Sequence, residues 1–263
     1  MFIVISHMPN LLKIFVITLA GSLFILNCEN DSEIDTDKNT YYDDIADITY
    51  LNGSFYTTNY DLSGNAGSQI DLLKFHANDS IYVTDRFDLE MNGQGYISIT
   101  NDGSDLYLQS RETSLIRKCS PIGENAYTDW DTISTNWQPC GITYLSEKDS
   151  LLTLYRNLDT LTQYRARVIS KDRTFTSSMD TVFHFDFIDT TYHGIYALTH
   201  KGSSFYMLGV DTSMTDILIL TDNHFVVTDT TTITDSTVVG LCFRGNDLYF
   251  SYRDKRIQYW KTY

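Results

Sequence analysis

The sequence predicts an all-β fold built from about five similar units. Apolar and polar residues alternate in short runs rich in Tyr, Thr, Val, Ile and Phe. Asn, Asp, Gly and Ser separate these runs, which is the pattern of strands joined by turns. No stretch shows the apolar stripe of an amphipathic helix. A similar segment also recurs five times along the chain, and such self-similarity indicates a repeat architecture.

Each recurring unit consists of an apolar strand, a tight polar turn and a second strand that opens on a pair of apolar residues. The units occupy residues 48–61, 97–111, 142–156, 195–210 and 239–253. The five apolar pairs are Phe55-Tyr56, Leu106-Tyr107, Leu151-Leu152, Phe205-Tyr206 and Leu248-Tyr249. The first residues of successive apolar pairs are 51, 45, 54 and 43 residues apart.

This spacing is typical of the β-propeller, whose blades repeat about every 40–50 residues and hold about four strands. The apolar pairs agree with it, because a strand packed between two neighbouring blades is buried on both faces. We therefore expect about five four-stranded blades over residues 48–263. A pair of β-sandwiches, an irregular β-solenoid and a sixth, eroded unit are the alternatives. Trp130-Asp131 occurs once and does not recur, so the repeat is not of the WD type.

The intervals between the units contain the remaining predicted strands. Only Arg256–Tyr263 follows the fifth unit, which leaves the last blade one strand short. We expect Tyr41–Ile45 to supply that strand and so remove an exposed sheet edge. The other predicted strands are Ile70–Phe75, Ser80–Phe87, Leu115–Cys119, Tyr127–Ile133, Thr162–Ile169, Thr174–Val182, Asp216–Leu220 and Phe225–Thr231.

The chain begins with a segment typical of export. Lys13 precedes an uncharged apolar run, Ile14–Leu26, of 13 residues. A helix needs about 20 apolar residues to span a bilayer, whereas this length suits the apolar core of a signal peptide. Because the first residues are unusually apolar for a signal peptide, Met8 is an alternative start. The sequence predicts a signal peptide over residues 1–27.

Ile25-Leu26-Asn27-Cys28 resembles the lipobox of bacterial lipoproteins, in the relaxed form found in spirochaete lipoproteins. The resemblance implies that Cys28 carries fatty acyl chains such as palmitate and anchors the protein to the cell envelope, with the outer membrane as the expected location. Several acyl chains make a stable anchor, while one alone binds only marginally. A secreted protein with an incidental thiol at Cys28 and an uncleaved N-terminal anchor are the alternatives.

The segment after Cys28 is predicted to be an acidic tether, residues 28–47. It contains eight acidic residues, from Glu29 to Asp47, and the single base Lys38. Like charges with little apolar material keep such a segment extended and solvated. Residues 35–39 begin like a calcium-binding loop but lack its later ligands, so no metal site is expected there.

The net charge limits the classes of partner. The chain has 19 Lys and Arg residues against 34 Asp and Glu residues, which gives a formal charge of −15. Binding to nucleic acid depends on clustered basic residues, and so does adsorption to an anionic membrane surface. We therefore expect no nucleic-acid partner. No cofactor motif or zinc-ligand spacing is present, and we predict neither a cofactor nor a metal.

Three cysteines follow the tether. Cys119 and Cys140 are predicted to form a disulfide if the compartment is oxidising. Cys242 lies in an apolar strand and is expected to be a buried small side chain.

Catalytic motifs are lacking. A propeller-type enzyme acting on glycans needs two carboxylates that face each other. Asp47, Asp102, Asp186 and Asp189 are acids near predicted inner strands, but a chain with 34 acids contains such residues by chance. His184 and Asp186 are expected on one strand face, where a structural role is the commoner one.

Two Trp residues lie in polar segments that are expected to be exposed. Exposed Trp and Tyr often carry much of the energy of recognition, so Tyr127, Trp130 and Trp137 form the predicted binding surface; capping of the core is the alternative role. We therefore expect a membrane-anchored, non-catalytic scaffold that binds a protein or a glycan. A glycan-active enzyme and a structural envelope lipoprotein are the other possibilities.

Overall fold

A computed structural model describes residues 45–59, 69–76, 79–92, 96–110, 114–124, 127–130, 134–171, 179–190, 194–235 and 237–263. All of these belong to one compact unit, Tyr42–Tyr263. The predictions for the signal peptide, for Cys28 and for residues 29–44 of the tether lie outside the described residues. Among the described residues, no helix is long and apolar enough to cross a membrane.

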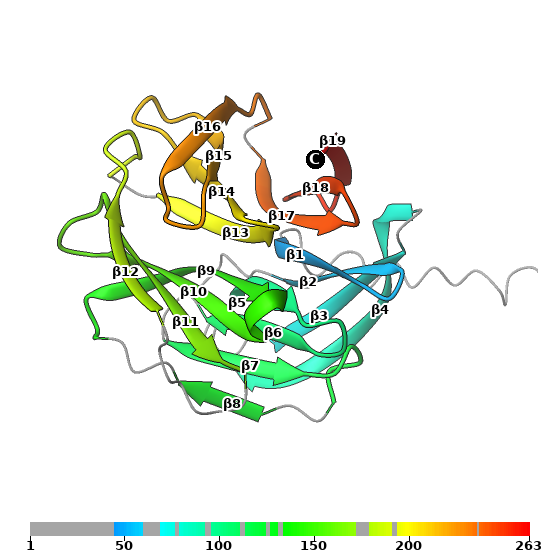
Figure 1. Ribbon diagram of the computed structural model, residues 1–263. Helices are drawn as coiled ribbons and strands as arrows, with labels where there is room; N and C mark the ends of the chain where they lie inside the picture. Colours follow the sequence, from blue (N-terminus) through cyan, green and yellow to red (C-terminus); the bar gives the residue numbers. More distant parts are fainter. Residues whose placement is uncertain are drawn as a thin grey trace, which may run out of the picture. The chain divides into compact units, whose positions relative to one another are not determined.

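The described residues form five antiparallel sheets, which we number as blades in chain order (Figure 1). Blade 1 contains β1 (Ile45–Leu51), β2 (Ser54–Asn59), β3 (Gln69–His76) and β4 (Asp79–Asn92). Blade 2 contains β5 (Tyr96–Asn101), β6 (Leu106–Ser110), β7 (Leu115–Cys119) and β8 (Tyr127–Trp130). Blade 3 contains β9 (Trp137–Leu145), β10 (Ser150–Asn157), β11 (Gln163–Ser170) and β12 (Met179–His184), with the short helix η1 (Ser146–Lys148) in its first turn. Blade 4 contains β13 (Ile195–Lys201), β14 (Ser204–Val210), β15 (Asp216–Thr221) and β16 (Val227–Thr232). Blade 5 contains β17 (Val238–Arg244), β18 (Asp247–Tyr252) and β19 (Ile257–Thr262).

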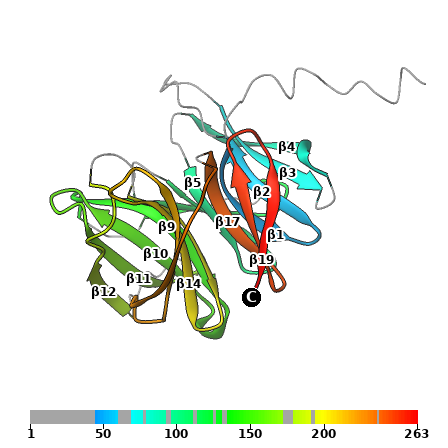
Figure 2. The ribbon, with the colours of Figure 1, turned by 90° about the horizontal axis from the view of Figure 1, so that it is seen from above.

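The first strands of the five blades make a closed ring. Each of β1, β5, β9 and β13 contacts the first strand of the next blade, and β17 contacts β1. Figure 2 shows blade 5, coloured orange to red, against blade 1, coloured blue to cyan. The domain is therefore a five-bladed β-propeller, as the repeat spacing predicted.

Two boundaries differ from the prediction. Blade 5 has three strands among the described residues, and Ile45 begins β1 rather than a fourth strand of that blade. The rest of the expected closing strand, residues 41–44, lies outside the described part. The propeller also begins earlier than residue 48, because Ala46 and Asp47 belong to β1 and are buried. Asp47 was predicted to be a solvated tether residue, because its position in a run of acids gives no sign of burial.

The apolar pairs occupy the second strand of every blade. Both members are buried in the first four blades, while in blade 5 Leu248 is buried and Tyr249 is half-buried. Their alternate side chains pack against different neighbours: Phe55 lies in the cluster that joins blades 5 and 1, whereas Tyr56 lies in the cluster that joins blades 1 and 2. Burial on both faces explains why these strands read as continuous apolar runs.

The centre of the ring is tightly packed. In each blade, the pairing of the first two strands shifts register near the start of the first strand. In four blades the first strand has a small residue beside this shift: Ser98, Gly141, Ala197 and Gly240. A Cβ on Gly240 would lie 2.5 Å from Cα of Asp47, and one on Gly141 would lie 2.7 Å from Cβ of Leu198. Real side chains do not approach so closely, and so glycine allows these strands to converge.

Polar bonds add to the apolar packing at all five junctions between blades. Between blades 1 and 2, Asn101 Nδ2 donates to Thr49 Oγ1 at 2.6 Å. Between blades 2 and 3, the Tyr144 N–H donates to Thr100 Oγ1 at 3.1 Å. The other three junctions are bridged by Ile195 N–H to Tyr164 Oη at 3.2 Å, Lys201 Nζ to Asn246 Oδ1 at 2.8 Å, and Leu241 N–H to Asp47 Oδ1 at 3.0 Å.

Candidate functional site

Asp47 lies in β1, the first strand of blade 1, and is 1% exposed. Its Oδ1 accepts the N–H groups of Ile48 at 2.9 Å and Leu241 at 3.0 Å. Burial raises the pKa of Asp47 well above its usual value, and the backbone donors of Leu241, Ile48 and Ile99 oppose this effect only in part. Asp47 therefore joins the first strands of blades 1 and 5 and is enclosed by backbone.

The other acids proposed for catalysis do not converge on Asp47. Asp102 lies in the β5–β6 turn, where it binds Lys171. β12 ends at His184, so strand alternation does not reach Asp186, which is exposed in the following turn. Asp189 is buried, and its N–H donates to the carbonyl of Val210. Within the described ranges, no group of three His, Cys, Asp or Glu residues is placed to hold a metal ion.

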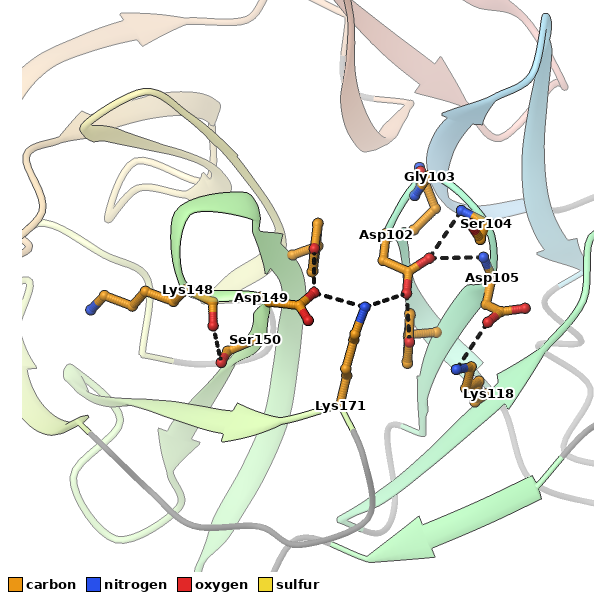
Figure 3. Close-up of polar contacts among 12 residues, drawn as sticks. Asp102, Gly103, Ser104, Asp105, Lys118, Lys148, Asp149, Ser150 and Lys171 are labelled. Carbon is orange, nitrogen blue, oxygen red and sulfur yellow. Dashed lines mark hydrogen bonds and ion pairs between the residues drawn. The ribbon is translucent and has the colours of Figure 1, made fainter.

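A polar cluster lies at the junction of blades 2 and 3 (Figure 3). Lys171, just after β11, bridges two turns: its Nζ lies 3.2 Å from Asp102 Oδ2 and 2.7 Å from Asp149 Oδ1. Tyr107 donates to Asp102 at 2.9 Å, and Tyr144 donates to Asp149 at 2.6 Å. One ammonium group thus ties the first turn of blade 2 to the first turn of blade 3.

The charges of this cluster stabilise one another. Burial disfavours ionisation of Asp102, but the amides of Asp105 and Ser104, the Tyr107 hydroxyl and Lys171 together lower its pKa to about 2. Hydrogen bonds to Asp149 and Asp102 raise the pKa of Lys171. The three groups are therefore charged at neutral pH, and we assign the cluster a structural role at the junction.

Beneath this cluster, the two blades share an apolar layer. Tyr107 and Ile116 of blade 2 pack against Ile142, Leu151 and Ile169 of blade 3. This contact identifies the face of blade 3 that is turned towards blade 2.

The same face of blade 3 continues into an exposed surface that we call the blade 3 patch. Its rows follow from strand pairing: Trp137, Asn157, Gln163 and His184 lie side by side, and Arg165 and Val182 lie in the next row on that face. The Arg165 guanidinium lies 5.6 Å from the centre of the Trp137 ring and forms an ion pair with Asp180. Val182 is 49% exposed. We define the blade 3 patch as Trp137, Gln163, Arg165, Val182 and His184.

The structure describes the side chain of one of the three residues predicted for binding. Trp137 is half-buried at the start of β9 and belongs to the blade 3 patch. Tyr127 and Trp130 are the two ends of β8, and their side chains lie outside the described part of the structure. Sequence reasoning missed Arg165, Gln163 and Val182. The alternation in Gln163-Tyr164-Arg165-Ala166-Arg167 was an available signal, because it places three polar residues on one strand face.

The expected disulfide is not formed, because Cys119 and Cys140 are free thiols. They lie in different apolar clusters, one between blades 1 and 2 and the other between blades 3 and 4. Burial raises the pKa of Cys119 to about 12 and raises that of Cys140 further. Cys242 is also a free thiol and is buried in β17, as predicted.

Comparison with known proteins supports the fold. No family model and no curated protein matches this chain. The solved structure of Myxococcus xanthus glutaminyl cyclase is similar, with a TM-score of 0.55 and 12% identity, over 82% of this chain and 91% of that chain. A chain from a nidogen/laminin complex has a TM-score of 0.51 and 14% identity, over 79% of this chain and 72% of that chain. At these identities the likeness concerns the fold alone.

Proposed function

We propose that this protein is a lipid-anchored envelope protein whose propeller is a non-catalytic scaffold that binds a protein or a glycan. The blade 3 patch is the observation that carries the proposal. It combines an indole ring, a guanidinium, an amide, an imidazole and an exposed apolar side chain on one rigid sheet face. Trp and Arg are the residues that most often dominate recognition, and a surface held by strands is preorganised for binding.

The arrangement of acids favours binding over the glycan-active alternative. A glycosidase needs two carboxylates about 5–10 Å apart on either side of a substrate. Asp47 is enclosed by backbone donors, and Asp102 forms an ion pair with Lys171. Asp186 and Asp189 lie in the connection that follows β12. These positions support a non-catalytic role.

The binding part of the proposal is tested by capture from envelope extracts and by a glycan array. Trp137→Ala combined with His184→Ala should reduce capture or glycan binding at least tenfold. Tyr259→Ala is the matched control, because it removes another exposed aromatic ring, 54% exposed, on blade 5. Equal binding by the double variant and the wild type would refute the patch as the binding surface.

The anchor is tested separately by metabolic labelling with palmitate. The wild type should be labelled and should fractionate with the outer membrane, whereas Cys28→Ala should be unlabelled. A wild-type protein without label would exclude lipidation while leaving the binding result unaffected.

A further inference from the structure

Arg117 is a buried base between blades 1 and 2. It lies in the middle of β7 and pairs across the sheet with Leu108. Leu108, Leu115 and Cys119 share its face of the sheet and pack in the apolar cluster that joins blades 1 and 2. Arg117 is only 9% exposed, and its buried Nε has no hydrogen-bond partner among the described residues.

An arginine in this setting calls for an anion. A guanidinium keeps its charge in proteins, and a buried charge without a partner is costly. Five carboxylates of these two blades bind other groups: Asp71 binds Arg86, Asp85 binds Lys74, Asp102 binds Lys171, Asp105 binds Lys118, and Asp47 binds backbone N–H groups. The neighbouring Cys119 does not supply the charge, because its raised pKa keeps the thiol neutral.

A second donor lies on the same face. Ser110 is two residues beyond Leu108 on β6, so its side chain points to the same side of the sheet as Arg117. Ser110 is 0% exposed, and its hydroxyl has no hydrogen-bond partner among the described residues. Two unused donors thus lie diagonally across one strand pair, at a separation that a single small ligand spans.

We propose that Arg117 and Ser110 form a binding site for a small oxyanion, a carboxylate or a phosphate-like group, between blades 1 and 2. Arginine binds such groups with charge-assisted hydrogen bonds, to which a hydroxyl donor adds. The remaining exposure of Arg117 leaves a route from solvent. The site does not depend on the lipid anchor, and it lies on the face of blade 2 opposite to the one that meets blade 3.

The experiment measures thermal unfolding of the full chain while acetate, phosphate or sulfate replaces chloride at constant ionic strength. Wild type should show saturable stabilisation by at least one of these anions. The apparent dissociation constant should increase about tenfold or more in Arg117→Met and by less in Ser110→Ala. A response to acetate alone indicates a carboxylate ligand, and a response to phosphate or sulfate indicates a phosphate-like one. Lys118→Met is the matched control: it alters the same strand on the opposite face and should keep the wild-type response.

Sulfate and phosphate also stabilise folded states without binding to a site, because they are excluded from protein surfaces. The stabilisation that remains in Arg117→Met measures this unspecific effect. In chloride, Arg117→Met should be at least as stable as wild type, because methionine removes a buried charge that has no partner. No saturable response in wild type, or an equal one in Arg117→Met, would overturn the proposal. So would loss of stability in Arg117→Met without an anion effect in wild type, since that result means that a carboxylate of the chain already neutralises Arg117. If Arg117→Met does not fold, the anion responses of Ser110→Ala and Lys118→Met are compared instead. A weaker response in Ser110→Ala than in Lys118→Met supports the site, and equal responses overturn it.

Discussion

Leu241 donates its backbone N–H to the Asp47 carboxylate at 3.0 Å, although 194 residues separate the two positions. The bond joins the first strand of blade 5 to the first strand of blade 1, where the ring closes. It also explains why a carboxyl group is tolerated in a buried position there, since the buried N–H groups of Ile48 and Leu241 need an acceptor.

Asp47→Ala should destabilise the fold. The substitution leaves the N–H groups of Ile48 and Leu241 without an acceptor in a buried site. We expect the free energy of unfolding to fall by roughly 3 kcal/mol, measured by urea denaturation. A loss below about 0.5 kcal/mol would show that the ring closes without this carboxylate.

Asp47 also predicts a pH dependence. Because its pKa is raised in the folded state, the folded protein binds more protons than the unfolded chain above the usual carboxyl pKa of 3.8. Its contribution is therefore fully present below that value and is lost as the pH rises towards the folded pKa. The stability of Asp47→Asn relative to wild type should increase from about pH 4 to pH 7. A constant difference in urea titrations over this range would contradict the raised pKa.

Lys171→Met should weaken the junction of blades 2 and 3. The Asp102 side chain that loses its partner is 5% exposed, so we expect the free energy of unfolding to fall by roughly 1 kcal/mol near neutral pH. The folded pKa of Asp102 is about 2, against an ordinary value of 3.8, so the stabilisation is present above the ordinary value and is lost as pH falls towards 2. The difference from wild type should therefore shrink in acid. Asp149→Asn is the control and should have a smaller effect, because Asp149 is solvent-exposed.

Gly240→Ala should lower the free energy of unfolding, because it crowds the contact between blades 5 and 1. The new Cβ would lie 2.5 Å from Cα of Asp47, and backbone cannot move aside without shifting a strand. Overpacking of this kind costs about 1–3 kcal/mol, to be measured by thermal and urea unfolding. Gly103→Ala is the comparison, because its Cβ would meet nothing within 4 Å and would add only the strain of a positive φ. A larger loss in Gly103→Ala than in Gly240→Ala would contradict the packing.

The three propeller cysteines should be reduced and protected. Cys119, Cys140 and Cys242 are buried, and burial raises the pKa of each thiol, so little reactive thiolate forms. Alkylation without reductant should modify none of them in the folded protein and all three in denaturant, as read by mass spectrometry. Failure of Cys119 and Cys140 to react in denaturant without reductant would show that they form a disulfide.

The strand pattern was predictable because it depends on local chemistry. Leu115–Cys119 was predicted and found as β7, and the pairs such as Leu106-Tyr107 identified the second strands. Burial on two faces leaves a continuous apolar run that can be read directly. The first residues of β1 were missed because Asp47 follows a run of acids. The contact between Arg165 and Trp137 was missed because the two residues are 28 positions apart in the sequence. They meet only through the register in which β9, β10 and β11 pair.

The sequence alone therefore determined the fold class, the repeat and the number of blades, since these follow from the spacing of strands and turns. It also supplied the expectation of a lipid anchor at Cys28, which rests on a local motif. Tertiary structure decided which polar residues meet. It placed Asp47 at the closure of the ring, kept Cys119 and Cys140 in separate cores, and left Arg117 buried between blades 1 and 2. The physical reason is that burial and pairing depend on the positions of neighbouring blades, which the order of residues within one strand does not specify.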